Sequence, residues 1–298
     1  MKPEEFRCGY VVIAGRPNVG KSTLLNGLLG EKLSIVSHKP QTTRHQILGV
    51  LTDEAAQVVF IDTPGLHRKA GRALNRSLNR AATTAVADAD LAIFVVEALR
   101  WTEEDEDVLL RLREHETPTF LVINKIDRVT DKSQLLPFID DLRRRTECEE
   151  IFPLSALKHD GIDVLLNAIR TYLPPGPALF PPDQLTDRSE RFIASEIIRE
   201  KLTRALHQEL PYGINVEIES YQEDEKGVRI SAVIWVERAG QKAIAIGHKG
   251  ETLKAVGRSA RLELKGRLGR PVHLELWVKV LANWADNERH LRRFGYDV

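Results

Sequence analysis

A glycine-rich octet near the N-terminus constrains the fold of this 298-residue chain more than any other feature. Its sequence, GRPNVGKS from Gly15 to Ser22, satisfies the pattern G-x-x-x-x-G-K-[ST]. The apolar run Tyr10–Ala14 precedes it and the amphipathic stretch Lys21–Leu29 follows it, which is the strand–loop–helix context of a phosphate-binding P-loop. Backbone N–H groups in such a loop face phosphates, and the positive end of the helix dipole reinforces them. The octet therefore predicts a nucleotide site on an α/β sheet.

The octet also assigns roles to its own side chains. We expect Lys21 to reach the β- and γ-phosphates and Ser22 to ligate Mg²⁺. The whole octet is a predicted nucleotide-binding set: Gly15, Arg16, Pro17, Asn18, Val19, Gly20, Lys21 and Ser22.

The first 173 residues alternate apolar runs with amphipathic stretches. The apolar runs predict strands buried on both faces of a parallel sheet, at Tyr10–Ala14, Gln57–Ile61, Leu91–Val96, Thr119–Ile123 and Glu150–Leu154, with an edge strand at Gln46–Leu51. The amphipathic stretches predict helices at Lys21–Leu29, Arg72–Val86, Glu103–Glu114, Gln134–Arg145 and Ile162–Tyr172. This alternation indicates an α/β domain, residues 1–173, with a mostly parallel sheet and helices on both faces.

A proline-rich segment ends the alternation. Five prolines fall among residues 174–182, where they extend the backbone and forbid helix, so residues 174–188 are a predicted interdomain linker. A polyproline ligand for a partner domain is the alternative. Residues 189–298 then predict an α+β domain in the order helix, strand, strand, helix, helix, strand. Its expected elements are Ser189–Glu209, Ile214–Tyr221, Val228–Val236, Gln241–Ile246, a helix ending near Gly266, and Val272–Val280, with a last helix from about Asn283.

Basic charge is concentrated at the C-terminal end. Residues 238–298 hold 13 basic and 6 acidic side chains, although the whole chain has 43 of each. Such asymmetry indicates an anionic partner. The two cysteines, Cys8 and Cys148, cannot form a disulfide framework, and the apolar runs are too short to span a bilayer. The sequence predicts a soluble, cytoplasmic protein.

The tetrad Asp62-Thr63-Pro64-Gly65 follows a predicted buried strand. The strand delivers the Asp62 carboxylate to the carboxyl edge of the sheet, where ligands bind in such folds. There Asp62 can hold the Mg²⁺ hydration shell, and the Gly65 amide can approach the γ-phosphate. All four residues are predicted nucleotide contacts.

The motif Asn124-Lys125-Ile126-Asp127 indicates which nucleotide base the site binds. The Asp127 carboxylate accepts only, and it can take hydrogen bonds from guanine N1–H and the exocyclic amine, a donor pair that adenine lacks. The segment Ser155-Ala156-Leu157 fits a loop whose Ala156 amide would meet guanine O6. Together the ordered motifs, including Asn124 and Lys125, predict GTP binding. An ordinary cap is the alternative interpretation of Asp127.

The tetrad Gly247-His248-Lys249-Gly250 lies between two predicted helices of the second domain. A GXXG loop in this position is the clamp by which KH domains hold four backbone nucleotides. Helix N-termini and Lys249 favour the negative charge of a phosphate backbone. The predicted RNA contacts are this tetrad with Lys254 and Arg258; a simple helix–helix turn is the alternative.

Apolar residues around this loop can either line the RNA-binding surface or pack in the core. Trp277 and Trp284 can both stack on bases, but we expect Trp277 in the core because it lies within an apolar strand. A further apolar set is expected partly to line the KH groove and mostly to form core: Ile244, Ile246, Leu253 and Val256.

Over almost its whole length the chain resembles the translation-factor-related GTPases, and within them the TrmE-Era-EngA-like family. Residues 272–280 with Asn283-Trp284-Ala285-Asp286 resemble the C-terminus of its ribosome-assembly members. The resemblance implies hydrolysis of GTP to GDP with Mg²⁺, and a type II KH domain that binds the 3′ end of 16S rRNA during assembly of the small (30S) ribosomal subunit. It also implies peripheral inner-membrane contact, for which the sequence offers only a basic C-terminal surface. No DNA partner is expected.

The resemblance further implies a switch I motif at Gln41-Thr42-Thr43-Arg44. Thr43 is the expected Mg²⁺ ligand beside Ser22 and Asp62, and the sequence leaves the neighbouring Thr42 hydroxyl open.

GTP hydrolysis needs a group that orients the attacking water or stabilises the developing charge, and no sequence motif identifies this group directly. Leu66 stands where Ras-like enzymes carry a water-orienting glutamine. In related GTPases a P-loop asparagine coordinates K⁺ in place of an arginine finger, and our hypothesis is that Asn18 does so here. The alternative is a turn residue chosen for its backbone conformation. The expected catalytic set is Asn18, Lys21, Thr43 and Gly65.

Two other functions stay open at this point. A nucleotide-gated RNA chaperone with incidental hydrolysis would carry the same motifs. A small-molecule kinase would use the P-loop but would not need the guanine motif at residues 124–127.

Overall fold

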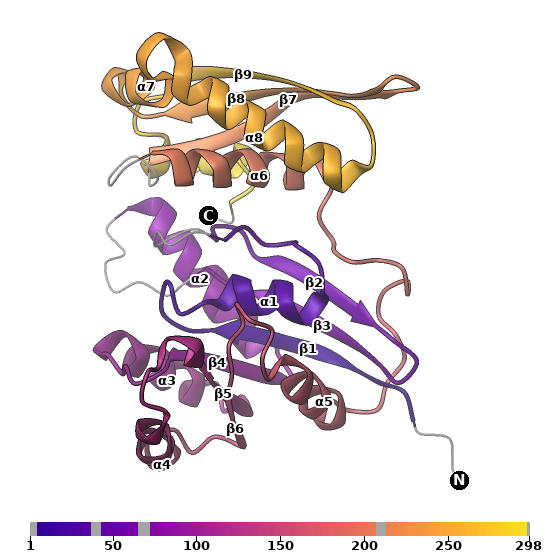
Figure 1. Ribbon diagram of the computed structural model, residues 1–298, viewed down its shortest axis with the longest axis vertical. Helices are drawn as coiled ribbons and strands as arrows, with labels where there is room; N and C mark the ends of the chain where they lie inside the picture. The colour runs from indigo at the N-terminus through magenta and orange to yellow at the C-terminus, as the bar shows by residue number, and fades with distance from the viewer. Residues whose placement is uncertain (1–4, 37–42, 65–71, 207–212, 297–298) are drawn as a thin grey trace. The chain divides into compact units, whose positions relative to one another are not determined.

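The computed structural model describes residues 5–36, 43–64, 72–206 and 213–296. The chain forms two compact units (Figure 1). The N-terminal unit comprises most of the residues up to Asp187, and the C-terminal unit comprises mainly those from Arg188 onward. Each unit is described by itself.

The N-terminal unit is built on a six-stranded sheet of order β2-β3-β1-β4-β5-β6. Its strands are β1 (Arg7–Ala14), β2 (Ile47–Thr52), β3 (Ala56–Asp62), β4 (Leu91–Glu97), β5 (Thr119–Asn124) and β6 (Glu150–Pro153). All neighbours pair in parallel except β2 with β3. The mostly parallel sheet and its additional edge strand are confirmed. The four central strands are buried almost throughout, which explains their continuously apolar sequences.

Helices cover both faces of this sheet. They are α1 (Lys21–Leu29), α2 (Ala73–Ala87), α3 (Glu103–Glu114), α4 (Leu135–Thr146) and α5 (Ile162–Tyr172). Helices α1 and α5 contact each other and β3 on the face turned to the viewer in Figure 1. On the other face a buried cluster joins Phe94, Val108, Leu121 and Leu142. Because parallel strands end at one edge, the loops after β1, β3, β4, β5 and β6 share the carboxyl edge of the sheet.

The proline-rich segment is hydrogen-bonded along the N-terminal unit. The Cys8 amide donates to the Pro174 carbonyl (3.0 Å), and the Val50 amide donates to the Leu185 carbonyl (2.8 Å). The buried Gln57 side chain accepts from the Leu179 and Phe180 amides at 2.7 and 2.9 Å. The segment predicted as a linker thus lies against the first unit, because an extended chain rich in proline still offers carbonyls and the remaining amides to an edge.

The C-terminal unit has the predicted order of elements. They are α6 (Glu190–Ala205), β7 (Ile214–Asp224), β8 (Gly227–Val236), α7 (Ala239–Ile246), α8 (Glu251–Leu268), β9 (Val272–Val280) and α9 (Glu288–Arg293). The expected end of the first helix at Glu209 lies outside the described residues. Strand β8 pairs antiparallel with β7 and parallel with β9. Helices α6 and α8 run side by side along this sheet (Figure 1), and α8 buries Val256, Ala260 and Leu264 at a spacing of four.

The two C-terminal tryptophans lie in different environments, and the prediction for Trp277 is wrong. Trp277, predicted for the core, is 45% exposed on β9. Trp284 is fully buried, where its Nε1 donates to the Gly213 carbonyl (3.2 Å) and its ring meets Phe294 edge to face. In β9 the residues Val272 and Val278 face inward, so Trp277 belongs to the alternate, outward phase of the strand.

Candidate functional site

The P-loop connects β1 to α1 and needs glycine at two positions. Gly15 and Gly20 have φ values of 151° and 105°. A Cβ on Gly15 would lie 2.6 Å from the Val95 carbonyl oxygen, and one on Gly20 would lie 2.3 Å from Asn124 Nδ2. The loop therefore lies directly against the ends of β4 and β5, and a side chain at either position would push it away.

Lys21 is buried at the start of α1. Its Nζ donates to the carbonyls of Gly15 (2.8 Å) and Arg16 (3.0 Å). Burial lowers the Lys21 pKa to about 8, although the nearby Asp62 carboxylate raises it. A phosphate beside this ammonium would favour its charged form.

Three oxygen-bearing side chains meet beside the P-loop, as predicted for magnesium ligands. Ser22 Oγ lies 2.9 Å from Thr43 Oγ1 and donates to Asp62 Oδ2 at 3.0 Å. Asp62 Oδ1 is buried and has no hydrogen-bond partner among the described residues. Burial raises the Asp62 pKa, against the lowering effect of Lys21. Hydroxyl and carboxylate oxygens with one free buried acceptor fit a hard cation such as Mg²⁺.

Ser34 is a member of this cluster that sequence reasoning missed. Its Oγ donates to Asp62 Oδ2 at 2.8 Å. Asn26 on α1 holds the segment in place, accepting from the Leu33 and Ser34 amides at 2.9 and 2.8 Å and donating to the Ser34 carbonyl at 2.7 Å. Ser34 belongs to no sequence motif, and only the folded chain brings it to Asp62.

The guanine motif and the P-loop are joined by one side chain. Asn124 Nδ2 donates to the Val19 carbonyl (2.8 Å), and Asn124 Oδ1 accepts from the Ala156 amide (3.0 Å). Ser155 Oγ donates to Asp127 Oδ1 at 2.6 Å. The structure thus gathers residues 124–127, residues 155–156 and the P-loop at one edge. The Ala156 amide, predicted to meet guanine O6, here donates to Asn124. Leu157 is exposed.

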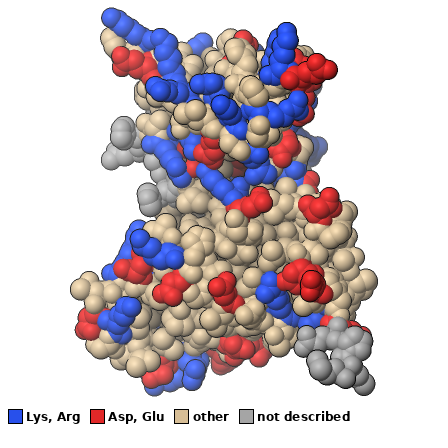
Figure 2. Space-filling model, turned by 45° about the vertical axis from the view of Figure 1, so that its right-hand side comes forward, with Lys and Arg blue, Asp and Glu red and all other residues tan. Residues whose placement is uncertain are grey.

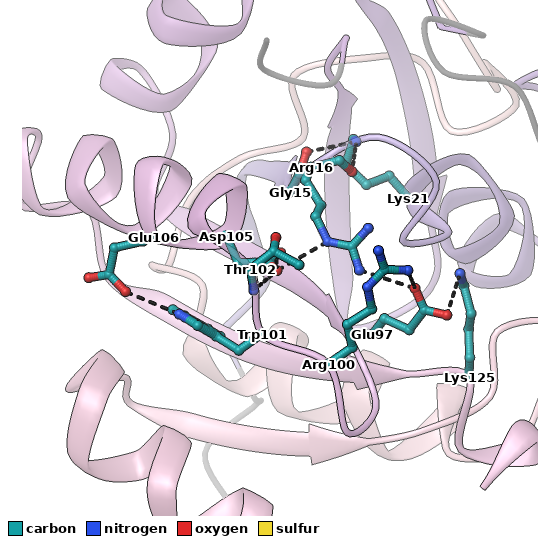
Figure 3. A network of polar contacts seen from close by, with 10 residues as sticks. All are labelled: Gly15, Arg16, Lys21, Glu97, Arg100, Trp101, Thr102, Asp105, Glu106 and Lys125. Carbon is teal, nitrogen blue, oxygen red and sulfur yellow. Dashed lines mark hydrogen bonds and ion pairs between the residues drawn. The ribbon is translucent and has the colours of Figure 1, made fainter. Parts of the chain in front are cut away.

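Arg16 and Lys125 use their side chains within the protein (Figure 3). Arg16 is buried, with Nε 3.1 Å from Asp105 Oδ2 and Nη2 3.1 Å from Glu97 Oε2. Lys125 Nζ lies 3.2 Å from Glu97 Oε1. The backbone carbonyl of Arg16 accepts a hydrogen bond from Lys21, the residue predicted to reach the phosphates. Glu97 and Asp105 were not singled out by the sequence.

Other predicted residues have less direct places. Thr63 is buried and donates to the Ile13 carbonyl (2.9 Å), so its hydroxyl stabilises the loop after β3. Pro64 is buried and Pro17 is half-buried beside the same edge. Asn18 is exposed with φ 66°, the backbone conformation that its alternative interpretation as a turn residue requires. Gly65, Leu66, Gln41 and Thr42 lie outside the described residues.

The GXXG loop links α7 to α8 in the C-terminal unit. Gly247, Lys249 and Gly250 have φ values of 76°, 49° and 81°. A Cβ on Gly247 would lie 2.2 Å from Thr252 Oγ1, whereas one on Gly250 would have no atom closer than Lys254 Cε at 3.9 Å. The open side of Gly250 leaves room for close approach of a ligand backbone.

The predicted RNA contacts are exposed around this loop: His248, Lys249, Lys254 and Arg258. Of the flanking apolar set, expected mostly in the core, only Val256 is buried; Ile246 and Leu253 are half-buried and Ile244 is 53% exposed. Apolar side chains therefore border the loop at the surface. Figure 2 shows Lys and Arg crowding this view of the C-terminal unit, while acidic and basic side chains mix over the N-terminal unit.

Two family models match the chain. The model described as 50S ribosome-binding GTPase matches residues 10–125, and the model described as KH domain matches residues 209–285. None of the helices in the described residues is both long and apolar enough to cross a membrane.

Two relatives match the chain over almost its whole length. GTPase Era from Coxiella burnetii (strain Dugway 5J108-111) is 52% identical over 297 residues, covering 100% of both chains. GTPase Era from Histophilus somni (strain 129Pt) is 51% identical over 297 residues, covering 99% of both chains.

Two solved structures are similar over both units. One is Aquifex aeolicus Era, as a variant bound to GDP and AlF4⁻; the other is Era in complex with MgGDPNP and nucleotides 1506–1542 of 16S ribosomal RNA. Each has a TM-score of 0.95 at 42% identity and covers 98% of this chain and 100% of that chain.

Proposed function

This chain belongs to the Era family of GTPases, and on that basis we propose that it couples GTP hydrolysis in the N-terminal unit to RNA binding by its KH domain. The RNA is the 3′ end of 16S rRNA, and the process is assembly of the small ribosomal subunit. One observation carries the proposal: phosphate, metal and guanine motifs converge at one sheet edge of a chain that also presents an exposed GXXG loop.

The phosphates of GTP would occupy the region bordered by the P-loop and α1. Lys21 would exchange its two loop carbonyls for phosphate oxygens, a step favoured because a buried ammonium gains a full negative partner. Ser22, Thr43 and Asp62 would hold Mg²⁺, whose chemistry is to neutralise charge on the β- and γ-phosphates. The predicted Gly65 contact to the γ-phosphate remains part of this proposal.

The guanine base would bind at the ends of β5 and β6. Asp127 would accept from the base, while the Ser155 hydroxyl fixes the orientation of the carboxylate. Asn124 keeps this loop attached to the P-loop through the Val19 carbonyl. For the Ala156 amide to reach guanine O6, its bond to Asn124 must be shared or exchanged.

The catalytic cation remains a proposal about Asn18. An exposed amide oxygen on the P-loop can ligate K⁺ without adding charge, and K⁺ would offset charge that develops between the β- and γ-phosphates. Arg44, the arginine of the switch I motif, is buried.

RNA would be held at the GXXG loop by backbone proximity and charge. Support comes from the Era structure that contains nucleotides 1506–1542 of 16S rRNA, which matches 98% of this chain at 42% identity. The exposed Lys249, Lys254 and Arg258 would neutralise RNA phosphates. We place the protein in the cytoplasm; peripheral inner-membrane contact rests on the same basic surface and remains a prediction.

The test is a titration of labelled RNA by fluorescence anisotropy. An RNA of the sequence 1506–1542 should bind more tightly than the same nucleotides in scrambled order. Multiple-turnover release of phosphate from GTP is measured on the same preparation. Equal affinity for the two RNAs would reject the rRNA assignment, and hydrolysis limited to one turnover would favour the chaperone alternative.

A further inference from the structure

Four charged side chains of alternating sign form a line behind the P-loop (Figure 3). Asp105 Oδ2 lies 3.1 Å from Arg16 Nε, Arg16 Nη2 lies 3.1 Å from Glu97 Oε2, and Glu97 Oε1 lies 3.2 Å from Lys125 Nζ. The exposed Arg100 is a third cation, with Nη1 3.9 Å from Glu97 Oε2. Glu97 is the member that contacts both Arg16 and Lys125, one with each oxygen.

The two cations come from different halves of the nucleotide site. Arg16 is the second residue of the P-loop, and Lys125 is the second residue of the guanine motif. Their side chains are shielded, with 6% and 19% of the side-chain surface exposed. Glu97 therefore links the phosphate half to the base half through ion pairs that water reaches only in part.

The backbone places Glu97 directly beside the start of the guanine motif. It is the last residue of β4, and it pairs in register with Asn124, the first residue of the guanine motif. The Ala98 amide donates to the Asn124 carbonyl at 2.9 Å, so the chain after Glu97 is also attached to that motif. Lys125 has φ 68°, a left-handed conformation that requires support from its surroundings.

The far end of the line is fixed by a helix start. Asp105 Oδ2 accepts from Thr102 N (2.9 Å) and Thr102 Oγ1 (2.8 Å) in the capping box of α3, as well as from Arg16. Asp105 is fully buried. Arg16 thus has one rigid anchor in α3, and Glu97 carries the connection onward to Lys125.

We propose that Glu97 is a positioning residue that holds Lys125 and Arg16 to one carboxylate and so fixes the spacing between the base and phosphate halves of the guanine-nucleotide site. The inference rests on the nucleotide roles proposed above for the P-loop and residues 124–127. Its effect is on nucleotide affinity and residence time, because the reacting γ-phosphate region at Ser22, Thr43 and Asp62 is not in contact with Glu97 through any described hydrogen bond.

The test uses Glu97→Gln in the full-length protein, because the amide keeps the size of the side chain, removes the charge and leaves one oxygen instead of two to accept from the cations. We expect GDP to dissociate about tenfold faster and KM for GTP to rise about tenfold, with kcat within about twofold of the wild type. Glu114→Gln, an exposed carboxylate at the end of α3, is the matched control and should change neither value. Thermal unfolding of the nucleotide-free proteins checks that Glu97→Gln is folded at the assay temperature.

A double-mutant cycle with Lys125→Met shows whether Glu97 acts through Lys125. If it does, Glu97→Gln changes GDP dissociation by less than about threefold in the Lys125→Met background, against about tenfold in the wild type. A full tenfold change in both backgrounds would reject the link. A fall in kcat at unchanged KM would also reject it, since a positioning role predicts the reverse.

The same data separate this inference from the proposed function. If Asp127→Asn leaves GDP affinity unchanged, the guanine-site assignment itself fails, and if Lys125→Met alone leaves it unchanged, the link through Glu97 is rejected. If Lys125→Met weakens GDP binding and Glu97→Gln does not, the site stands and only the positioning role of Glu97 is overturned.

Discussion

The Ser155 hydroxyl donates a 2.6 Å hydrogen bond to Asp127 Oδ1 from a loop 28 residues further along the chain. A carboxylate with one oxygen fixed in this way is oriented before a base arrives, so less freedom is lost on binding. The carboxylate carries no donor of its own, and after the bond from Ser155 it still has lone pairs that can accept hydrogen bonds from a base. Nucleotide choice should therefore depend on this residue.

Asp127→Asn should exchange guanine for xanthine preference. The amide presents donors where the carboxylate accepted, so GTP affinity should fall about a hundredfold, while the additional carbonyl of xanthine can accept from the amide. Competition of GTP and XTP against a fluorescent nucleotide measures both affinities. Asp131→Asn, an exposed carboxylate in the following turn, is the control. Unchanged GTP affinity in Asp127→Asn would remove this residue from the base site.

Asp substitutions at both His248 and Lys249 should abolish RNA binding and leave GTP binding intact. Two negative charges at an exposed clamp repel the phosphate backbone, and the P-loop belongs to the other unit. A filter-binding titration should show RNA affinity at least about tenfold lower, with GDP affinity within about twofold of the wild type. Arg289→Asp reverses an exposed charge on α9 as the control. Retained RNA affinity in the double variant would make the GXXG loop a simple turn.

Hydrolysis should be faster in potassium than in sodium, and Asn18→Gly should remove the difference. Glycine keeps the left-handed backbone at φ 66° without strain and deletes the amide oxygen, so it separates a cation ligand from a turn residue. Asn18→Ala deletes the oxygen as well but adds backbone strain. Single-turnover rates at saturating GTP and fixed ionic strength are the measurement. An arginine finger contributes about 10³–10⁵ in rate, so loss of the K⁺ ion that replaces it should give a large fall in the hydrolysis rate. A salt difference that persists in Asn18→Gly would defeat the hypothesis.

Lys21→Met should stabilise the nucleotide-free protein at neutral pH while it abolishes GTP binding. The Lys21 pKa falls from 10.5 to about 8 on folding, so below pH 8 the folded state holds an unfavourably buried charge. At about 1.4 kcal/mol per unit this costs about 3 kcal/mol, offset in part by two carbonyl hydrogen bonds.

The pH dependence of that difference has a definite sign. Between about pH 8 and 10.5 the unfolded chain binds the Lys21 proton that the folded chain has released, so wild-type stability rises with pH through this window. The advantage of Lys21→Met in urea unfolding should therefore be constant below pH 8 and shrink above it. An advantage that grows toward pH 10.5 would contradict the burial argument.

The sequence was sufficient wherever a local pattern determines the structure. Strands buried on both faces, such as residues 58–61, are continuously apolar, and a P-loop must join strand to helix, so the α/β unit and its site edge were predictable. Ser34, Glu97 and Asp105 were not, because each acts through a contact with a residue at least 28 positions away and belongs to no local pattern.

The misplaced tryptophan has a different cause. Strand β9 reads VHLELWVKV, in which every second residue from Val272 is apolar and the intervening positions are His273, Glu275, Trp277 and Lys279. The strand period of two places Trp277 with the polar residues, so the signal was present, but the apolar character of tryptophan outweighed its phase.

Because Trp277 and Trp284 lie in opposite environments, the fluorescence of each residue reports on a different event in the protein. Trp277 is 45% exposed, open to an ionic quencher such as iodide, whereas Trp284 is sealed beneath Phe294 and emits from an apolar setting. Emission from Trp277 therefore reports on events at the surface of β9 in the intact molecule, and emission from Trp284 reports on whether the C-terminal unit is folded. Once the other two tryptophans, Trp101 and Trp235, are replaced by phenylalanine, a single unlabelled sample can distinguish a ligand that covers the sheet from a change that unfolds it.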